Sequence, residues 1–192
     1  MGWPTDYAGW ITRIKEWLTQ YDLPDASFGY CIDAANIRLN RDLNSQWMEK
    51  TYSFVTADTN PIDLATIVPD FNRMRLVTVA GLPPLYAKSL QEFKLAMAED
   101  PSDGGDSVMY VVNGMKLSIW PPPAIGSAID IDYYMMVPAL SASIASNIFS
   151  EKHPDALLYA ALIEATPYIG EDERLDIWST MYGGIRESIS VT

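Results

Sequence analysis

The sequence contains a single cysteine and a single histidine, Cys31 and His153. One cysteine cannot form a disulfide within the chain, and neither a cysteine cluster nor a set of histidine ligands is available to bind a metal ion. We therefore expect no metal and no cofactor. A lone free cysteine fits a protein that is made and kept in a reducing cytoplasm.

Positive charge is also scarce. Lysine and arginine total 13 against 25 aspartates and glutamates, which gives a formal net charge of -12. The cations are scattered along the chain, and the closest pairs are Arg38/Arg41 and Arg73/Arg75. Because binding to the phosphates of nucleic acid requires clustered cations that displace counterions, the chain is not expected to grip DNA. An acidic surface is instead suited to letting DNA slide past without sticking.

The sequence has no apolar run near the ~20 residues that span a bilayer, and its first residues lack the basic and apolar regions of a secretory signal. Asp6 stands where the myristoylation pattern requires Ser or Thr, so we expect neither a membrane span nor a lipid anchor. Hydrophobic residues make up 48% of the chain and the mean hydropathy is -0.01. These values are typical of a globular protein with one substantial core, or one core and an inserted lobe.

Recognisable catalytic motifs are missing too. No nucleophile lies in a Gly-x-Ser-x-Gly elbow, "VAGLPP" lacks the Lys-Ser/Thr of a phosphate loop, and "PSDGGD" lacks the spacing and closing glutamate of a calcium loop. Asp130 and Asp132 alternate along one strand, where a solvated face is a simpler interpretation than a cation site. A Cys31–His153 pair, or a Ser–His–Asp arrangement around His153, stays open because sequence separation does not limit distance in space.

The patterns that are present predict two helices near the start of the chain. Residues 5–22 carry apolar residues at three- and four-residue steps, with Thr5 as a candidate N-cap. After "DLPDAS" a second helix is predicted to run to about Leu43, with one apolar face and Gly29 inside it.

Two further helices are predicted after residue 150. His153 is most simply the residue before a helix, because Pro154 suits the first helical position. Pro167 should end or kink this helix, and Gly170 should cap it. The acidic phrase "EDER" then starts a last helix, which Gly183-Gly184 interrupts.

The middle of the chain changes to strand patterns. "TYSFV", "RLVTV" and 128–135 predict strands, and Asn113-Gly114 predicts a hairpin with a type I′ turn. Residues 89–100 predict a helix with a Ser89–Glu92 capping box. Residues 56–70 are expected to form a loop.

This order of elements predicts an α+β fold, in which a helical bundle built from the N- and C-terminal helices carries an inserted small antiparallel β lobe. Residues 1–47 with 150–192 are assigned to the bundle, and 48–149 to a β-rich lobe with one helix. Large aromatic side chains serve cores and interfaces alike. Together with two arginines they give the candidate interface residues Trp10, Trp17, Arg38, Arg41, Tyr159, Trp178 and Tyr182.

Several stretches taken together resemble the head-to-tail adaptor proteins of tailed bacteriophages. They are "ITRIKEWL" with "DLPDASFGYCIDAANIRLNRDL", "VPDFNRMRLVTVAGLPPLYAKSLQEF", "YVVNGMKLSIWPPP" followed by "IDIDYYMMVPALS", and "SEKHPDALLYAALIEATPYIGEDERLDIWSTMYGGIRESI". In that family a helix ends in an "RINRDL"-like phrase, here "IRLNRDL". Its most recognisable phrase, "HPDLYLYGALLEAAPYLKDDER…W", is matched from His153 to Trp178. The resemblance covers nearly the whole chain, and its motifs are structural rather than catalytic.

The resemblance implies a non-enzymatic virion protein, synthesised in the host cytoplasm. It implies a ring of commonly twelve copies that docks beneath the portal, offers a platform to tail or nozzle proteins and extends the DNA channel for packaging retention and ejection. DNA would pass through the ring without specific binding. Two alternatives stay open: a neck or tail-completion protein further from the portal and, in a different class, a small cytoplasmic hydrolase that uses acids or Cys31.

Overall fold

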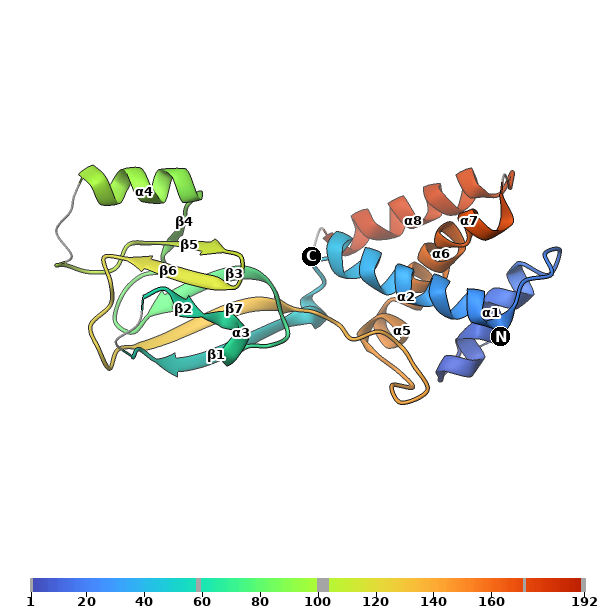
Figure 1. The fold of residues 1–192 in the computed structure, drawn as a ribbon, viewed down its shortest axis with the longest axis horizontal. Helices are drawn as coiled ribbons and strands as arrows, with labels where there is room; N and C mark the ends of the chain where they lie inside the picture. Colours follow the sequence, from blue (N-terminus) through green and yellow to red (C-terminus); the bar gives the residue numbers. More distant parts are fainter. Residues whose placement is uncertain (1, 58–59, 100–103, 171, 191–192) are drawn as a thin grey trace. The chain divides into compact units, whose positions relative to one another are not determined.

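The computed structural model describes residues 2–57, 60–99, 104–170 and 172–190. The chain is mixed α+β and divides into two compact units. One is helical and combines the residues up to Met48 with those from Val137 onward, and the other is β-rich and comprises Glu49–Met136 (Figure 1).

The helical unit is built around α6. Its elements are α1 (Tyr7–Trp17), α2 (Asp25–Asp42), the short 3₁₀ helix η1 (Gln46–Met48), α5 (Ile148–Lys152), α6 (Pro154–Glu164), α7 (Thr166–Ile169) and α8 (Leu175–Ser190). Helix α6 packs against α1, α2, α5 and α8. It is buried on several sides because alanines alternate with leucines along it, and small side chains let neighbouring helices approach closely. Its buried residues are Ala156, Leu157, Leu158, Ala160, Ala161 and Leu162.

The helix ends follow local chemistry. Pro154 begins α6, and Gly170 ends α7 with a φ of 72°, as their positions in the sequence predict. Helix α1 is shorter than predicted and starts after Asp6 rather than Thr5, because the Asp6 carboxylate accepts a hydrogen bond from the Gly9 N–H at 2.7 Å. Helix α8 continues through Gly183-Gly184, so the expected interruption is wrong. Burial of Trp178 and Tyr182 anchors the part of the helix that precedes that point.

The β-rich unit contains two sheets. The first is antiparallel and has β7 (Ala128–Met135) between β1 (Glu49–Val55) and β3 (Phe71–Val79). The second has the order β2 (Ile62–Asp63), β6 (Lys116–Trp120), β5 (Met109–Asn113) and β4 (Tyr86–Ala87). Strands β4 and β5 run parallel, a departure from the expected all-antiparallel lobe. Helices α3 (Leu64–Ile67) and α4 (Leu90–Glu99) complete the unit.

An apolar core fills the β-rich unit. The alternation predicted for β7 is confirmed, because Ile129, Ile131 and Tyr133 are buried while Asp130 is exposed. These side chains belong to one cluster with residues from β3 and β6, including Val77 and Ile119. The apolar side chains on alternate positions of the strands therefore hold the two sheets together.

Two loops differ from expectation. The β5–β6 hairpin is confirmed, but its central residues are Gly114 and Met115, since Asn113 pairs with Lys116. Of these two only Gly114 has a positive φ, 60°, which fits a type II′ turn and not the predicted type I′ turn. The loop predicted over 56–70 contains β2 and α3, and its residues 58–59 lie outside the described residues. Residues 100–103, which include the start of "PSDGGD", are also outside them.

Residues 137–149 lie in the helical unit, whereas the sequence boundaries assigned them to the β-rich lobe. Val137, Leu140 and Phe149 are buried there. Alternation continued to Met136 and so gave no sign of where the β-rich unit ends. The boundary is set by these buried contacts and by hydrogen bonds to the backbone of Val137.

Candidate functional site

Two asparagines of α2 fix the point where the chain re-enters the helical unit. The Asn40 side chain accepts a hydrogen bond from the Val137 N–H at 2.7 Å and donates to the Val137 carbonyl at 2.9 Å. Asn36 donates to the same carbonyl at 2.9 Å and accepts from Asn147, which also donates to the Pro138 carbonyl. All three asparagines are buried, so the network satisfies backbone groups that have lost water.

This network was missed at the sequence level although a signal existed. Asn36 and Asn40 are four residues apart, on a helix face otherwise occupied by Ile32, Ala35 and Leu39. Polar residues on an apolar helix face indicate buried hydrogen bonds. Both lie in the phrase "NIRLNRDL", which carries part of the family resemblance.

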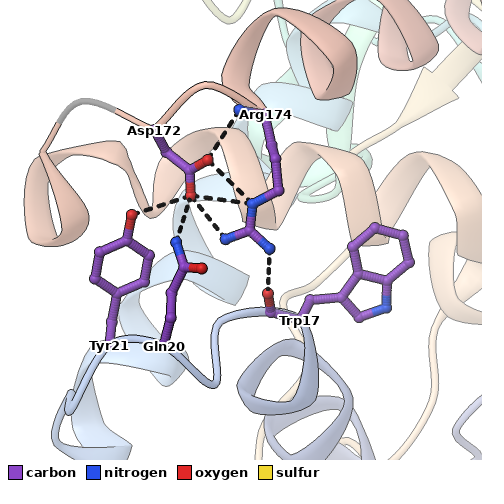
Figure 2. Close-up of polar contacts among 5 residues, drawn as sticks. All are labelled: Trp17, Gln20, Tyr21, Asp172 and Arg174. Atoms are coloured by element: carbon purple, nitrogen blue, oxygen red, sulfur yellow. Dashed lines mark hydrogen bonds and ion pairs between the residues drawn. The ribbon is translucent and has the colours of Figure 1, made fainter.

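A second polar cluster joins the end of α1 to the start of α8 (Figure 2). The Arg174 guanidinium donates to the Asp172 carboxylate through Nε and Nη2, with the Nη2–Oδ2 distance at 2.7 Å, and through Nη1 to the Trp17 carbonyl at 3.0 Å. Tyr21 and Gln20 donate to the same carboxylate from the α1 side, at 3.1 and 3.4 Å. The Arg174 hydrogen bonds lower the pKa of Asp172 to about 2.

A third cluster connects α2, α6 and α8 and contains three of the candidate interface residues. Arg38 pairs with Glu164, with Nε 2.6 Å from Oε1, and its guanidinium lies over the Tyr182 ring. The Tyr182 hydroxyl donates to Asp42 at 3.0 Å, and Arg41 pairs with the same carboxylate at 3.0 Å. Burial, followed by the charge of Asp42, raises the pKa of Tyr182. Arg38 of the "RLNRD" phrase thus contacts α6 and α8 of the same chain, whereas Arg41 pairs with its neighbour Asp42 on α2.

The seven candidate interface residues differ in exposure. Trp10, Trp178 and Tyr182 are buried within the chain's own core, and Trp10 stacks on Trp3. Arg38 and Tyr159 are half-buried, and only Trp17 and Arg41 are exposed. Trp17 packs edge-to-face on Tyr159. Trp17 and Arg41 therefore offer the most surface to another molecule.

Other large apolar side chains are more exposed than the aromatic candidates. Tyr30 and Ile37 project from α2, and Ile177 and Met181 project from α8. Sequence reasoning missed them because it followed the main apolar stripe of each helix. The signal was spacing: each pair is one or two turns apart on a second face of its helix.

The two groups that carried the enzymatic alternative, Cys31 and His153, are buried and half-buried. Burial raises the pKa of the Cys31 thiol to about 11, with a further contribution from Glu164, so the thiol stays protonated at neutral pH. His153 Nε2 lies 2.7 Å from Ser45 Oγ, and burial lowers its pKa. Ser45 is buried, and the Asp155 carboxylate accepts from the Ala156 N–H. The Ser45–His153 pair connects the residues before η1 to the junction between α5 and α6.

The acids give no cation site in the part of the chain that the structure describes. Asp132 accepts a hydrogen bond from Thr51, and Asp130 is exposed. Across residues 2–57, 60–99, 104–170 and 172–190, no three His, Cys, Asp or Glu side chains gather closely enough to bind a metal ion. None of the helices described there has the length and apolar character to cross a membrane.

A comparison with known protein families identifies the family of the chain. Among curated proteins none matches the chain. A family model described as SU10 adaptor protein matches residues 5–191, which include both units and all three polar clusters. The chain therefore belongs to the SU10 adaptor protein family, a structural family of phage head–tail adaptors.

Proposed function

We propose that the protein forms a closed ring in the virion, which joins the portal at the capsid vertex to the tail and extends the DNA channel for genome retention and ejection. The family match over residues 5–191 carries this proposal. In this arrangement the helical unit would form the body of the ring, and the β-rich unit would contact neighbouring copies or tail proteins. Twelve copies are the expected number.

Ring closure requires a heterologous interface, in which one surface of a copy meets a different surface of the next. Exposed apolar side chains on both units support such contacts: Tyr30 and Ile37 on α2, Ile177 and Met181 on α8, and Tyr86 and Leu95 in the β-rich unit. Single exposed apolar residues are common, but repeated ones on the same helix face favour a protein surface as their partner. Trp17 and Arg41 are the sequence candidates that remain available for such contacts.

The acidic excess supports a channel through which DNA passes without binding. A net charge of -12 repels the phosphate backbone, and most described cations are neutralised by acids within the chain. Acids that avoid the channel wall of the assembled ring would contradict this part of the proposal.

Cryo-EM of the virion, together with native mass spectrometry of the protein with and without its portal, tests the ring. We expect a multi-copy ring in direct contact with the portal. Density further down the neck would identify a tail-completion protein instead, and a single copy would refute the ring.

The Ser45–His153 pair is the observation that favours the alternative of a small hydrolase. Alanine substitutions at His153 and at Cys31 separate the two classes. An adaptor whose His153→Ala and Cys31→Ala variants still fold should still form particles. Loss of particles with folding intact, or turnover that depends on either residue, would favour an enzyme.

A further inference from the structure

An apolar groove lies on the β-rich unit between α4 and the β5–β6 hairpin. Leu90, Phe93 and Met97 line it from α4, and Val111 and Trp120 line it from the two strands. Its volume is about 470 Å³, within the range of pockets that take a drug-sized ligand, so it has room for a few side chains and not for a folded domain.

The groove is built on fixed elements. Phe93 and Val111 are buried in a small cluster that holds α4 against the sheet. On the opposite rim, the Asn60 side chain donates to the Ile119 carbonyl at 2.9 Å and accepts from the Ile119 N–H at 3.3 Å. This bidentate contact attaches the rim to β6. Preformed walls reduce the ordering required of a partner when it binds.

Two lysines give the groove its charge. Lys94 on α4 and Lys116 on β6 both line it and are exposed. Neither has an ion-pair partner among the described residues, whereas Lys50 and Arg75 of the same unit pair with Asp70 and Glu49. In a chain with 25 acids and 13 cations, an apolar groove that carries these two lysines fits an occupant that is apolar and acidic.

The exposed face of α8 has this chemistry. Ile177 and Met181 are 60% and 50% exposed and lie one turn apart. Asp176 precedes Ile177 on the helix, and Glu173 lies in the turn just before it; both acids are exposed and have no ion-pair partner within the described ranges. Apolar anchors at i and i+4 are the pattern by which a helix occupies a hydrophobic groove.

The exposed face of α2 is a weaker match. Tyr30 and Ile37 supply apolar surface, but Asp33 is the one acid between them, and Asp25 is already paired with Lys15. DNA is a weaker match as well, because two lysines over an apolar floor do not offset the repulsion of a chain with a net charge of -12.

We propose that the groove between α4 and the β5–β6 hairpin binds the start of α8 from a second copy of this chain, through the Asp176–Met181 face of the helix and Glu173 in the turn before it. The proposal rests on the ring assembly proposed above and names one of its contacts. Because the groove and the helix face are different surfaces, each copy uses both, as a heterologous interface requires.

Disulfide trapping between two single variants tests the contact. Chains that carry Lys94→Cys are mixed with chains that carry Asp176→Cys and oxidised; the native Cys31 is buried in both. A disulfide between the introduced cysteines then joins two copies. Lys88→Cys, an exposed lysine of the same unit outside the groove, replaces Lys94→Cys in the control. We expect a roughly tenfold higher yield of the 94–176 product than of the 88–176 product, because the groove, and not the surface around Lys88, meets the α8 face in the complex. Equal yields would overturn the proposal.

Charge reversal gives a second, independent readout. Lys94→Glu should weaken assembly, Asp176→Lys should do the same, and the double variant should recover most of the loss, whereas Lys88→Glu should have little effect. If Lys94→Glu instead blocks attachment of another virion protein and leaves contacts between copies intact, a different acidic partner occupies the groove and the second-copy assignment is wrong. Rings that form normally without the 94–176 disulfide would refute this contact alone, whereas absence of any ring would refute the proposed function.

Discussion

The contacts that stabilise the interior of the helical unit differ in kind from those that stabilise the interior of the β-rich unit. Polar side chains lie between the helices: Asn36, Asn40 and Asn147 satisfy backbone groups, and Arg38–Glu164 and Arg174–Asp172 connect separate elements. The β-rich unit is instead specified by strand register and an apolar core. It has polar contacts as well, and in one of them Lys50 and Tyr133 donate to the Asp70 carboxylate.

This difference indicates what each unit requires from its sequence. Packed helices can slide and rotate with little loss of apolar burial, so polar contacts with fixed geometry select one arrangement. In a sheet, a one-residue slip moves every side chain to the other face, so the apolar pattern alone selects the register. In the β-rich unit Lys94 and Lys116 can therefore pair with a partner, whereas most cations of the helical unit form ion pairs within the chain.

The largest predicted effect is at the central strand of the first sheet. Ile131→Ala removes a fully buried side chain of β7 and should reduce the free energy of unfolding by about 2–5 kcal/mol. Hydrogen exchange read by mass spectrometry should show loss of protection in β1, β3 and β7 while α6 keeps its protection. Val55→Ala, at an exposed position of β1, is the control and should change stability by less than about 0.5 kcal/mol. Equal loss of protection in α6 would show that the two units unfold together.

The next effect tests the buried asparagines. Asn40→Ala leaves the Val137 N–H without its acceptor in a buried site and should destabilise the protein by roughly 2–4 kcal/mol in urea denaturation. Gln46→Ala, an exposed amide of the same unit, should have little effect. A change at Asn40 as small as that at Gln46 would mean that register, and not polar contact, specifies the helical unit too.

A smaller effect is expected at the cluster of Figure 2, and it depends on pH. Asp172→Asn should destabilise the protein by about 1.5–3 kcal/mol at neutral pH, because the hydrogen bonds from Arg174 lose their charged acceptor. The pKa of Asp172 is lowered from 3.8 to about 2, so this stabilisation is present above pH 4 and is lost as the pH falls towards 2. The difference between wild type and variant should shrink over that range. With Asp22→Asn, an exposed acid in the loop after α1, we expect no such change.

The smallest effect concerns the start of α4. Ser89 and Glu92 form the capping box that the sequence predicts: the Ser89 N–H and hydroxyl donate to the Glu92 carboxylate, and the Glu92 N–H donates to Ser89 Oγ. Ser89→Ala should destabilise this helix end by about 1 kcal/mol. Faster amide exchange in the first turn of α4, with β7 unaffected, is the expected readout. Gln91→Ala serves as the control, and equal exchange in both variants would contradict a role for the cap.

The elements that could be predicted from sequence are those whose cause is local. Pro154, Gly170 and the Ser89–Glu92 box specify helix ends through their own backbone and side-chain chemistry. The alternation of Ile129, Ile131 and Tyr133 specifies a strand with one buried face. Helix α8 was harder, because burial of Trp178 and Tyr182 outweighs the low helix propensity of Gly183-Gly184.

The assembly surfaces were predicted less well than the fold. Tryptophan and tyrosine were interpreted as interface residues, but Trp10, Trp178 and Tyr182 are buried within the chain. A residue type does not reveal on which side of a helix its neighbours pack. The more exposed pairs, Tyr30 with Ile37 and Ile177 with Met181, become distinct only once the buried faces of α2 and α8 are known.

By itself the sequence determined the α+β class, the capped helix ends, the β5–β6 hairpin and, through its phrases, the adaptor family, because each depends on neighbouring residues or on a pattern along the chain. Only the tertiary structure decided that Asn36 and Asn40 bind the returning backbone at Val137, that Ser45 meets His153, and that Lys94 and Lys116 line one groove. These contacts join residues far apart in the chain, and their partners are chosen by packing in three dimensions, which no local pattern encodes.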